Sequence, residues 1–135
     1  MRMGDQVFFY GTLQTGFNRR SRAGVDELLT YVGRGSIGAR LFDLGLYPVA
    51  VPAAEGRVWG EVFEVADSAT VLAALDGIQG CRPAAPDSGL YTRVQVPVTL
   101  QDGRVSSAWV YFYNAPLGQA RDIPSGDYLD HLRAR

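Results

Sequence analysis

The chain has 135 residues, with 13 Lys and Arg against 14 Asp and Glu, so its formal net charge is -1. This length predicts one domain over residues 1–135, and the near-zero charge argues against nucleic acid or an anionic membrane as a partner. A small-molecule partner is therefore expected. The single cysteine, Cys81, excludes an internal disulfide framework. Because the N-terminus also lacks an apolar run of signal-peptide or membrane-spanning length, we expect a cytoplasmic protein.

The first half of the chain has the pattern of short strands separated by glycines. Residues 7–10 form an apolar run that predicts a buried strand ending at Gly11. The spacing of Val25, Leu28 and Leu29 favours one short helix. Further strands or extended segments are predicted at 31–37, 40–44, 47–52 and 57–65, the last with Gly60 at a bulge or kink.

The second half begins with a helix. Asp67 or Ser68 can cap it, and its apolar face is formed by Val71, Leu72, Leu75 and Ile78. A loop at 80–89 follows, and it has the composition of a segment that lies over a pocket mouth.

Two strands joined by a hairpin complete the pattern. Apolar and polar residues alternate over 93–100, where Pro97 indicates an edge or a bulge. Asp102-Gly103 is a strong hairpin signal before the strand at 107–113, which is apolar on both faces. Many short strands and few helices predict a sheet that is curled into a small barrel and partly covered by helices.

The turn after the first strand is the first candidate site. Gly11 allows a sharp turn there, and the amides of Gly11, Thr12 and Leu13 can point together at an anion such as a carboxylate. Strand-glycine turns are common, however, and for this segment taken alone an ordinary turn is the favoured explanation.

Six segments, in order, resemble the gamma-glutamylcyclotransferase-like family, and together they cover most of the chain. They are Tyr10-Gly11-Thr12-Leu13 with Asn18 after it, Leu44-Gly45-Leu46-Tyr47-Pro48, Val58 to Phe63, Leu75-Asp76, Tyr91-Thr92-Arg93-Val94, and Ile123 to Tyr128. Each segment is short, but as an ordered set they are specific.

This resemblance implies an α+β fold: a small mixed β-barrel of about five to seven strands, flanked by two or three short helices. It also implies a pocket for a gamma-glutamyl group, which family enzymes cyclise to 5-oxoproline with release of an amine, using no metal or organic cofactor. The substrate-binding residues carried over are Tyr10, Gly11, Thr12, Leu13 and Tyr91, with Asn18, Asp76 and Arg93 in support. The leaving amine and the oligomeric state stay open.

The same resemblance places Gln79 at the position of the family's catalytic Glu. During cyclisation the attacking nitrogen loses a proton and the departing amine gains one, so one carboxylate between them can serve both steps. A glutamine side chain can hydrogen-bond but takes no proton at working pH. We therefore expect binding without normal turnover, whether Gln79 arose by deliberate substitution or by natural divergence.

Two other classes of function remain open: a non-catalytic binding module for an acidic small molecule, and an interaction domain with a vestigial cavity. For several residues a structural role competes with a functional one. Asp76 can act as a substitute acid or bond to Arg93, and Tyr10 can present its hydroxyl to the site or fill the core. Cys81 and His131 lack the partners that a catalytic thiol or a metal ligand would need.

Overall fold

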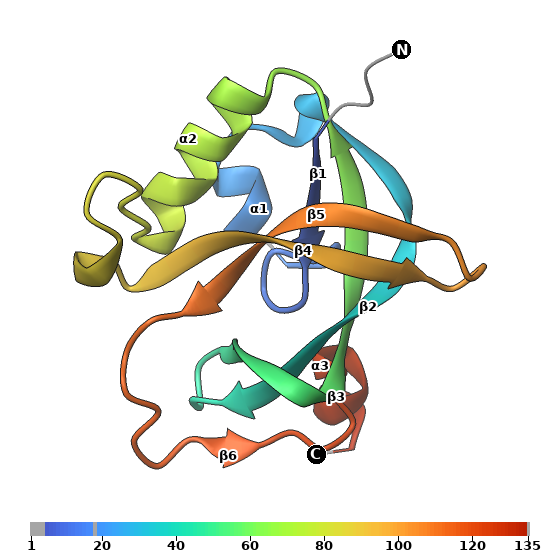
Figure 1. Cartoon of the computed structure of the whole chain (residues 1–135), viewed down its shortest axis with the longest axis vertical. Helices are drawn as coiled ribbons and strands as arrows, with labels where there is room; N and C mark the ends of the chain where they lie inside the picture. Colours follow the sequence, from blue (N-terminus) through green and yellow to red (C-terminus); the bar gives the residue numbers. More distant parts are fainter. Residues whose placement is uncertain (1–4, 18, 135) are drawn as a thin grey trace.

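The computed structural model describes residues 5–17 and 19–134, and strands dominate the described part of the chain (Figure 1). The strands are β1 (Gln6–Phe9), β2 (Leu29–Asp43), β3 (Pro48–Val65), β4 (Tyr91–Leu100), β5 (Val105–Tyr113) and β6 (Arg121–Asp122). The α-helices are α1 (Arg19–Arg22), α2 (Ser68–Gln79) and α3 (Tyr128–Arg133), and short 3-10 turns are η1 (Asp26–Leu28) and η2 (Pro86–Ser88). Within these described ranges, no helix has the length and apolar character needed to span a membrane.

Five of the strands close into a barrel. Strands β3, β1, β5, β4 and β2 pair in that order, and β2 pairs in turn with β3. Strands β1 and β5 run parallel, whereas their other neighbours are antiparallel, and β6 adds to β2 outside the ring. The prediction of a small mixed β-barrel with a few short helices is confirmed.

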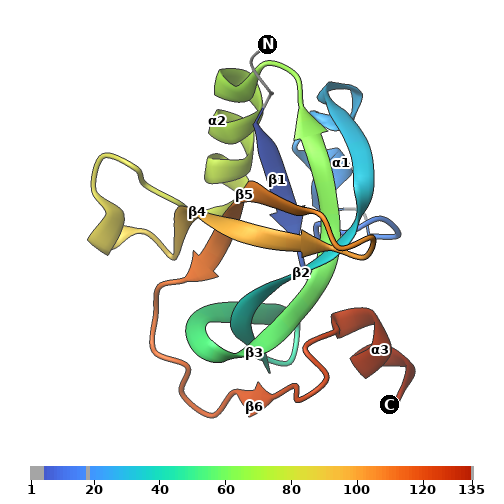
Figure 2. The same ribbon diagram turned by 45° about the vertical axis from the view of Figure 1, so that its right-hand side comes forward.

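Apolar side chains form two layers, one inside the barrel and one outside it. Along β1, Phe8 belongs to the inner cluster, while Val7 and Phe9 belong to the outer one, as the alternation of side chains in a strand requires. Helix α2 covers the outer layer with Val71, Leu72 and Leu75, so it lies along the barrel beside β1, whereas α3 lies at the other end of the molecule (Figures 1 and 2).

Helix α2 begins and ends where the sequence predicts. The carboxylate of Asp67 accepts the Thr70 N–H at its start, and Gly80 closes its end with a left-handed backbone, φ 64°. The short helix predicted around residues 25–29 is present only as the 3-10 turn η1, Asp26–Leu28, because Leu29 already pairs with Val65 at the start of β2. Pairing with β3 outweighs the weak helical spacing in this segment.

Strand β2 is continuous, although the sequence suggested two shorter strands. Its irregularities fall between Tyr31 and Gly33 and between Gly38 and Ala39.

Gly60 of β3 is not at a bulge, because it pairs regularly with Gly35. A Cβ at position 60 would instead overlap the carbonyl oxygen of Phe9. Glycine is therefore needed at this position so that β1 can approach β3 closely.

The hairpin between β4 and β5 forms as predicted, with Gly103 in the left-handed region at φ 91°. Strand β2 pairs with β4 through Gly35–Leu100 and Ser36–Thr99, beyond Pro97. Pro97 therefore lies on an open edge of β4, which a residue without an N–H tolerates.

Candidate active site

A cavity of about 240 Å³ lies where the loop after β1, the turn between β2 and β3 and the end of α2 meet the first residues of β4. The described residues that line it are Phe8, Phe9, Tyr10, Gly11, Thr12, Leu13, Tyr47, Pro48, Gln79, Leu90, Tyr91 and Tyr111. The barrel thus brings the 10–13 segment, residue 79 and Tyr91 to one cavity, although they are far apart in the sequence.

The loop after β1 is folded so that its carbonyl and amide groups have different roles. The carbonyl of Gly11 accepts hydrogen bonds from the backbone N–H of Gln14 at 3.1 Å and from its side-chain Nε2 at 3.3 Å. In the described part of the chain, the N–H groups of Gly11, Thr12 and Leu13 have no assigned acceptor. They are therefore available to an anionic oxygen.

Glycine is required at position 11 because the chain packs closely there. Its φ lies outside the left-handed region, but a Cβ would lie 2.9 Å from Cγ of Pro48. The sequence explanation, a sharp turn that only glycine allows, is therefore replaced by a steric one. The loop and the turn before β3 touch at this point, and both line the cavity.

Gln79 is the last residue of α2 and its side chain is 8% exposed. Two backbone bonds hold the helix end: Cys81 N–H donates to the Asp76 carbonyl at 2.9 Å, and Leu90 N–H donates to the Gly80 carbonyl at 2.8 Å. Residue 79 is therefore placed in the cavity wall by the end of the helix and by the chain entering β4.

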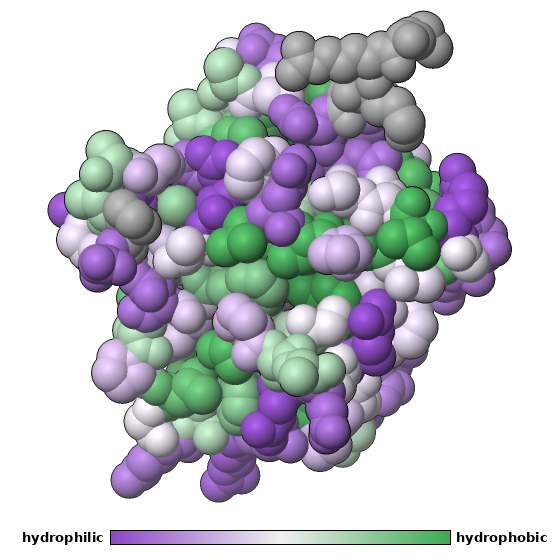
Figure 3. Space-filling model, in the orientation of Figure 1, coloured by the Kyte–Doolittle hydropathy of each residue, from purple (hydrophilic) through white to green (hydrophobic). Residues whose placement is uncertain are grey.

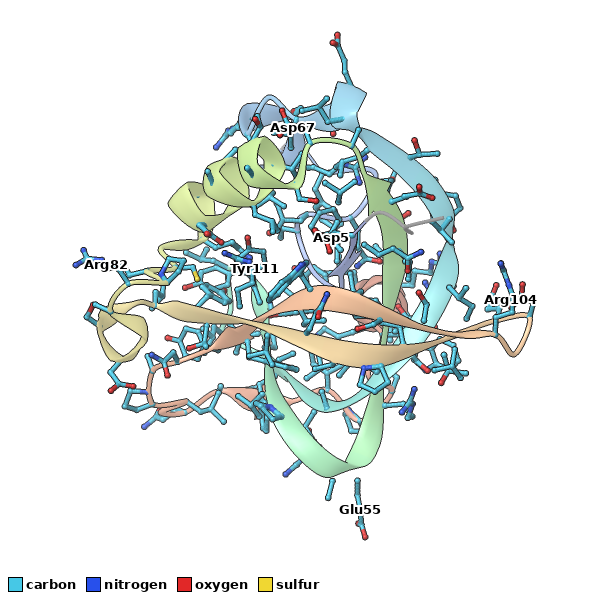
Figure 4. The ribbon with its side chains drawn as sticks, turned by 45° about the horizontal axis from the view of Figure 1, so that its top comes forward. Asp5, Glu55, Asp67, Arg82, Arg104 and Tyr111 are labelled. Atoms are coloured by element: carbon cyan, nitrogen blue, oxygen red, sulfur yellow. The ribbon has the colours of Figure 1, made fainter. Side chains whose placement is uncertain are left out.

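Asp76 and Arg93 form a structural pair outside the cavity lining. The Arg93 guanidinium donates to both carboxylate oxygens, at 2.9 and 3.1 Å, and Tyr111 donates its hydroxyl to Oδ1 at 2.7 Å. Figure 4 shows Tyr111 between β5 and α2. Burial lowers the pKa of Arg93, but its bonds to the Asp76 carboxylate outweigh this and raise it overall. The carboxylate therefore ties α2 to β4 and β5.

Two tyrosines of the cavity, Tyr10 and Tyr111, are neutral hydrogen-bonding groups. The hydroxyl of Tyr10 donates to the Tyr111 carbonyl at 2.6 Å. Burial, more than any nearby charge, raises the pKa of Tyr10 and of Tyr111 far above the ordinary value of 10.0. Neither phenol is therefore a base at neutral pH, and the hydroxyl of Tyr10 is engaged by the backbone.

The cavity lining is uncharged: no described residue that lines it is acidic or basic. The described ranges also contain no cluster of three or more His, Cys, Asp and Glu side chains of the kind that binds a metal. Cys81 lies just outside this lining, and burial raises the pKa of its thiol. His131 contacts Asp43, with Nε2 2.9 Å from Oδ2.

The sequence-predicted residues divide into three groups. Tyr10, Gly11, Thr12, Leu13, Gln79 and Tyr91 line the cavity together. Asp76 and Arg93 lie behind it as a pair, and Asn18 falls outside the described residues. The sequence analysis assigned no site role to Tyr47, Pro48, Leu90 or Tyr111. For the first three a signal existed, because they lie within or beside the segments that carry the family resemblance.

Comparison with known proteins agrees with this arrangement. Residues 7–130 match the family model described as gamma-glutamyl cyclotransferase, AIG2-like. The chain belongs to this family. The Escherichia coli K12 protein named gamma-glutamylcyclotransferase family protein YtfP is 36% identical over 131 residues, which cover 93% of this chain and 96% of YtfP.

Solved structures show the same fold. The solution structure of E. coli ytfP has a TM-score of 0.61 and 32% identity, and the match covers 93% of this chain and 97% of that one. A mouse AIG2-like protein has a TM-score of 0.67 with 23% identity, covering 85% of this chain and 81% of that protein. The gamma-glutamylcyclotransferase-like fold is thus established for this chain.

Proposed function

We propose that the cavity binds a gamma-glutamyl group and that this protein is a cyclotransferase-type enzyme that converts a gamma-glutamyl amine, peptide or protected intermediate to 5-oxoproline and a free amine. The observation that carries the proposal is the meeting of two features in one small cavity. These are the available amides of Gly11, Thr12 and Leu13, and the side chain of residue 79, to which the sequence resemblance assigns the position of the family's proton-transfer group.

The loop amides suit the substrate's α-carboxylate, because N–H groups that point at an anion bind it without a positively charged side chain. The cavity contains no charged group among its described residues, so the amides would be the main compensation for that negative charge. With the carboxylate held there, the α-amino nitrogen can approach the gamma-carbonyl carbon within the same molecule.

Ring closure forms a bond between the α-nitrogen and the gamma-carbon and breaks the bond from that carbon to the leaving amine. The α-nitrogen gives up one proton, and the leaving nitrogen takes one up. Holding the two reacting groups together lowers the barrier without any proton-transfer residue. General acid–base help adds about 10²–10⁴-fold, and the amide of Gln79 does not supply it.

Among the described residues that line the cavity, no acid is present that could transfer protons in place of residue 79. Asp76, three residues earlier, is bonded to Arg93 and to Tyr111. The form of the protein with Gln79 is therefore impaired in turnover while its binding cavity is complete. A complete cavity without an acid in its described lining also favours the second candidate function, a non-catalytic module that binds an acidic small molecule in this cavity.

Gln79→Glu separates these two functions. We expect the variant to release 5-oxoproline from a suitable gamma-glutamyl amine at least about 10²-fold faster than the protein with Gln79, with a much smaller change in affinity. Rates are compared at equal folded concentration across gamma-glutamyl amines and isopeptides. Gln95→Glu, which adds the same charge at an exposed position of β4, is the control and should gain no activity.

Equal rates in the two forms, with at least one substrate turned over, would show that residue 79 is not the proton-transfer group. Binding of gamma-glutamyl compounds with no turnover by either form would instead establish the non-catalytic module. Absence of both binding and turnover would reject the proposed ligand.

A further inference from the structure

A buried glutamine contacts the loop that offers its amides to the cavity. Gln14 is 1% exposed, although glutamine usually lies on protein surfaces. Its side-chain Nε2 donates to the Gly11 carbonyl at 3.3 Å, and its Oε1 has no hydrogen-bond partner among the described residues. A buried acceptor without a partner lowers stability. Packing alone therefore does not explain this residue, because an apolar side chain of similar size would avoid that loss.

Both hydrogen bonds from Gln14 act on one peptide group. The Gly11 carbonyl has two lone pairs, and Gln14 provides a donor for each, its backbone N–H at 3.1 Å and Nε2 at 3.3 Å. In a trans peptide group such as this one, the C=O and the following N–H point in opposite directions. The Thr12 N–H therefore points away from Gln14. Thr12 lines the cavity, whereas Gln14 is outside the described lining.

This peptide group would rotate easily if nothing held it. Gly11 lacks a Cβ and so has access to a wide range of backbone angles. Gly11 also packs against Pro48, whose Cγ lies 2.9 Å from the position of a Cβ. Pro48 follows the turn between β2 and β3, over which Figure 3 shows apolar surface. A proline ring restricts the space but forms no hydrogen bond with the peptide, so the direction of the peptide group depends on Gln14.

The far end of the loop is held by charged side chains. Arg20 Nη1 donates to the Leu13 carbonyl at 3.3 Å, and the Thr15 N–H donates to the Glu61 carboxylate at 2.6 Å. These bonds fix the course of the chain after the loop, but they do not act on its first peptide group. The side chain of Gln14 therefore has a role that these charged groups do not share.

We propose that Gln14 is a positioning residue, whose side chain holds the Gly11–Thr12 peptide group so that the Thr12 N–H is directed at the α-carboxylate of a gamma-glutamyl substrate. This inference rests on the proposed function, because it assumes that the carboxylate is bound by the loop. Donors that already point at an anion need no reorganisation when it binds. Such a residue contributes to affinity more than to stability.

The test compares two ligands that differ in one charged group. They are gamma-glutamyl n-butylamide and the same compound with an α-carboxamide in place of its α-carboxylate. Calorimetry measures both affinities for the protein with Gln79 and for its Gln14→Met variant, in which a side chain of similar length has no N–H donor. We expect the variant to bind the carboxylate compound on the order of tenfold more weakly. The affinity for the carboxamide compound should change much less.

Two further measurements separate positioning from a structural role. In the Gln79→Glu background, Gln14→Met should raise KM for 5-oxoproline release by a similar factor and change kcat less. The midpoint of urea unfolding should not fall, because the substitution removes the unpartnered Oε1 together with the donor. Gln14→Leu is a second variant without a donor and should give the same results.

Gln6→Met is the matched control. Gln6 is also a buried glutamine, 7% exposed, and it lies in β1 outside the described cavity lining. Its Oε1 accepts a hydrogen bond from the Ser106 hydroxyl. The control therefore removes a buried amide that is not bonded to the loop, and it should leave both affinities unchanged.

If Gln14→Met and Gln14→Leu keep the ratio of the two affinities, the inference is overturned, whatever their stability. Equal affinity of the protein with Gln79 for the two compounds would also overturn it, while leaving the cavity as a gamma-glutamyl site. If neither compound binds and Gln79→Glu turns over no gamma-glutamyl amine, the proposed function fails and this inference with it.

Discussion

At the scale of single residues, the close contact between Gly11 and Pro48 fixes the distance between two segments that line the cavity. The ring of Pro48 occupies the space that any larger side chain at position 11 would need, with Cγ 2.9 Å from the position of a Cβ. The loop that offers its amides and the turn before β3 are therefore adjusted to each other at one point.

Gly11→Ala should weaken binding of a gamma-glutamyl amide by on the order of tenfold, because the added methyl group pushes the loop and the turn apart. Forcing a methyl group into a packed site typically costs about 1–3 kcal/mol of stability. Calorimetry and urea unfolding measure the two effects. Pro48→Ala makes room for the added methyl group. The losses of binding and stability in the double variant, Gly11→Ala with Pro48→Ala, should therefore be smaller than the sum of the losses in the two single variants. Strictly additive losses would show that this contact does not matter.

At the scale of elements, α2 is attached to the barrel near its C-terminal end. Asp76 bonds to Arg93 of β4 and to Tyr111 of β5, with 12% of the Asp76 side chain and 17% of the Arg93 side chain exposed. Because Gln79 is one turn further along the same helix, this attachment also locates the cavity wall.

Asp76→Asn should lower the free energy of unfolding by about 3 kcal/mol, the lower end of the range for breaking a buried ion pair, because Arg93 keeps its charge without a full partner. Introduced together with Gln79→Glu, it should change the rate of 5-oxoproline release less than it changes stability. Urea unfolding and the release assay measure the two quantities.

Asp67→Asn is the matched control for this experiment, since it removes a carboxylate at the exposed N-terminal end of the same helix (Figure 4). Asparagine caps helices about as well as aspartate, so stability should change little. If Asp76→Asn left stability unchanged but abolished turnover in Gln79→Glu, Asp76 would be part of the chemistry and not of the scaffold.

At the scale of the whole molecule, buried tyrosines make stability depend on alkaline pH. In the unfolded chain Tyr10 and Tyr111 ionise near 10.0, whereas burial raises the pKa of both in the folded protein. Below about pH 10 both tyrosines are protonated in the folded protein and in the unfolded chain, so their contribution to the free energy of unfolding is fully present. Above about pH 10 the unfolded chain binds fewer protons than the folded protein, so the free energy of unfolding falls as pH rises.

The expected slope reaches about 1.4 kcal/mol per pH unit for each tyrosine. Urea unfolding over about pH 8 to 11.5 measures it. Tyr10→Phe and Tyr111→Phe should each make the curve shallower, whereas Tyr31→Phe, at a side chain that is 55% exposed, should not. Identical slopes in all four proteins would mean that the two buried phenols ionise as readily folded as unfolded.

Local patterns in the sequence were sufficient to predict several elements. The apolar face of residues 71–78 and the cap at Asp67 predicted α2, and Asp102-Gly103 predicted the hairpin between β4 and β5. These features depend on neighbours along the chain, so the sequence shows them directly. The ordered motifs also identified the family, and with it the barrel.

Other features depend on residues that are distant in sequence, and only the tertiary structure decided them. Closure of the barrel requires β1 to pair with both β3 and β5. That pairing placed Gln79 beside the 11–13 loop, joined Asp76 to Arg93 outside the cavity, and set Pro48 against Gly11. A sequence shows which groups a chain carries, but which of them meet depends on strand pairing and side-chain packing across the whole barrel.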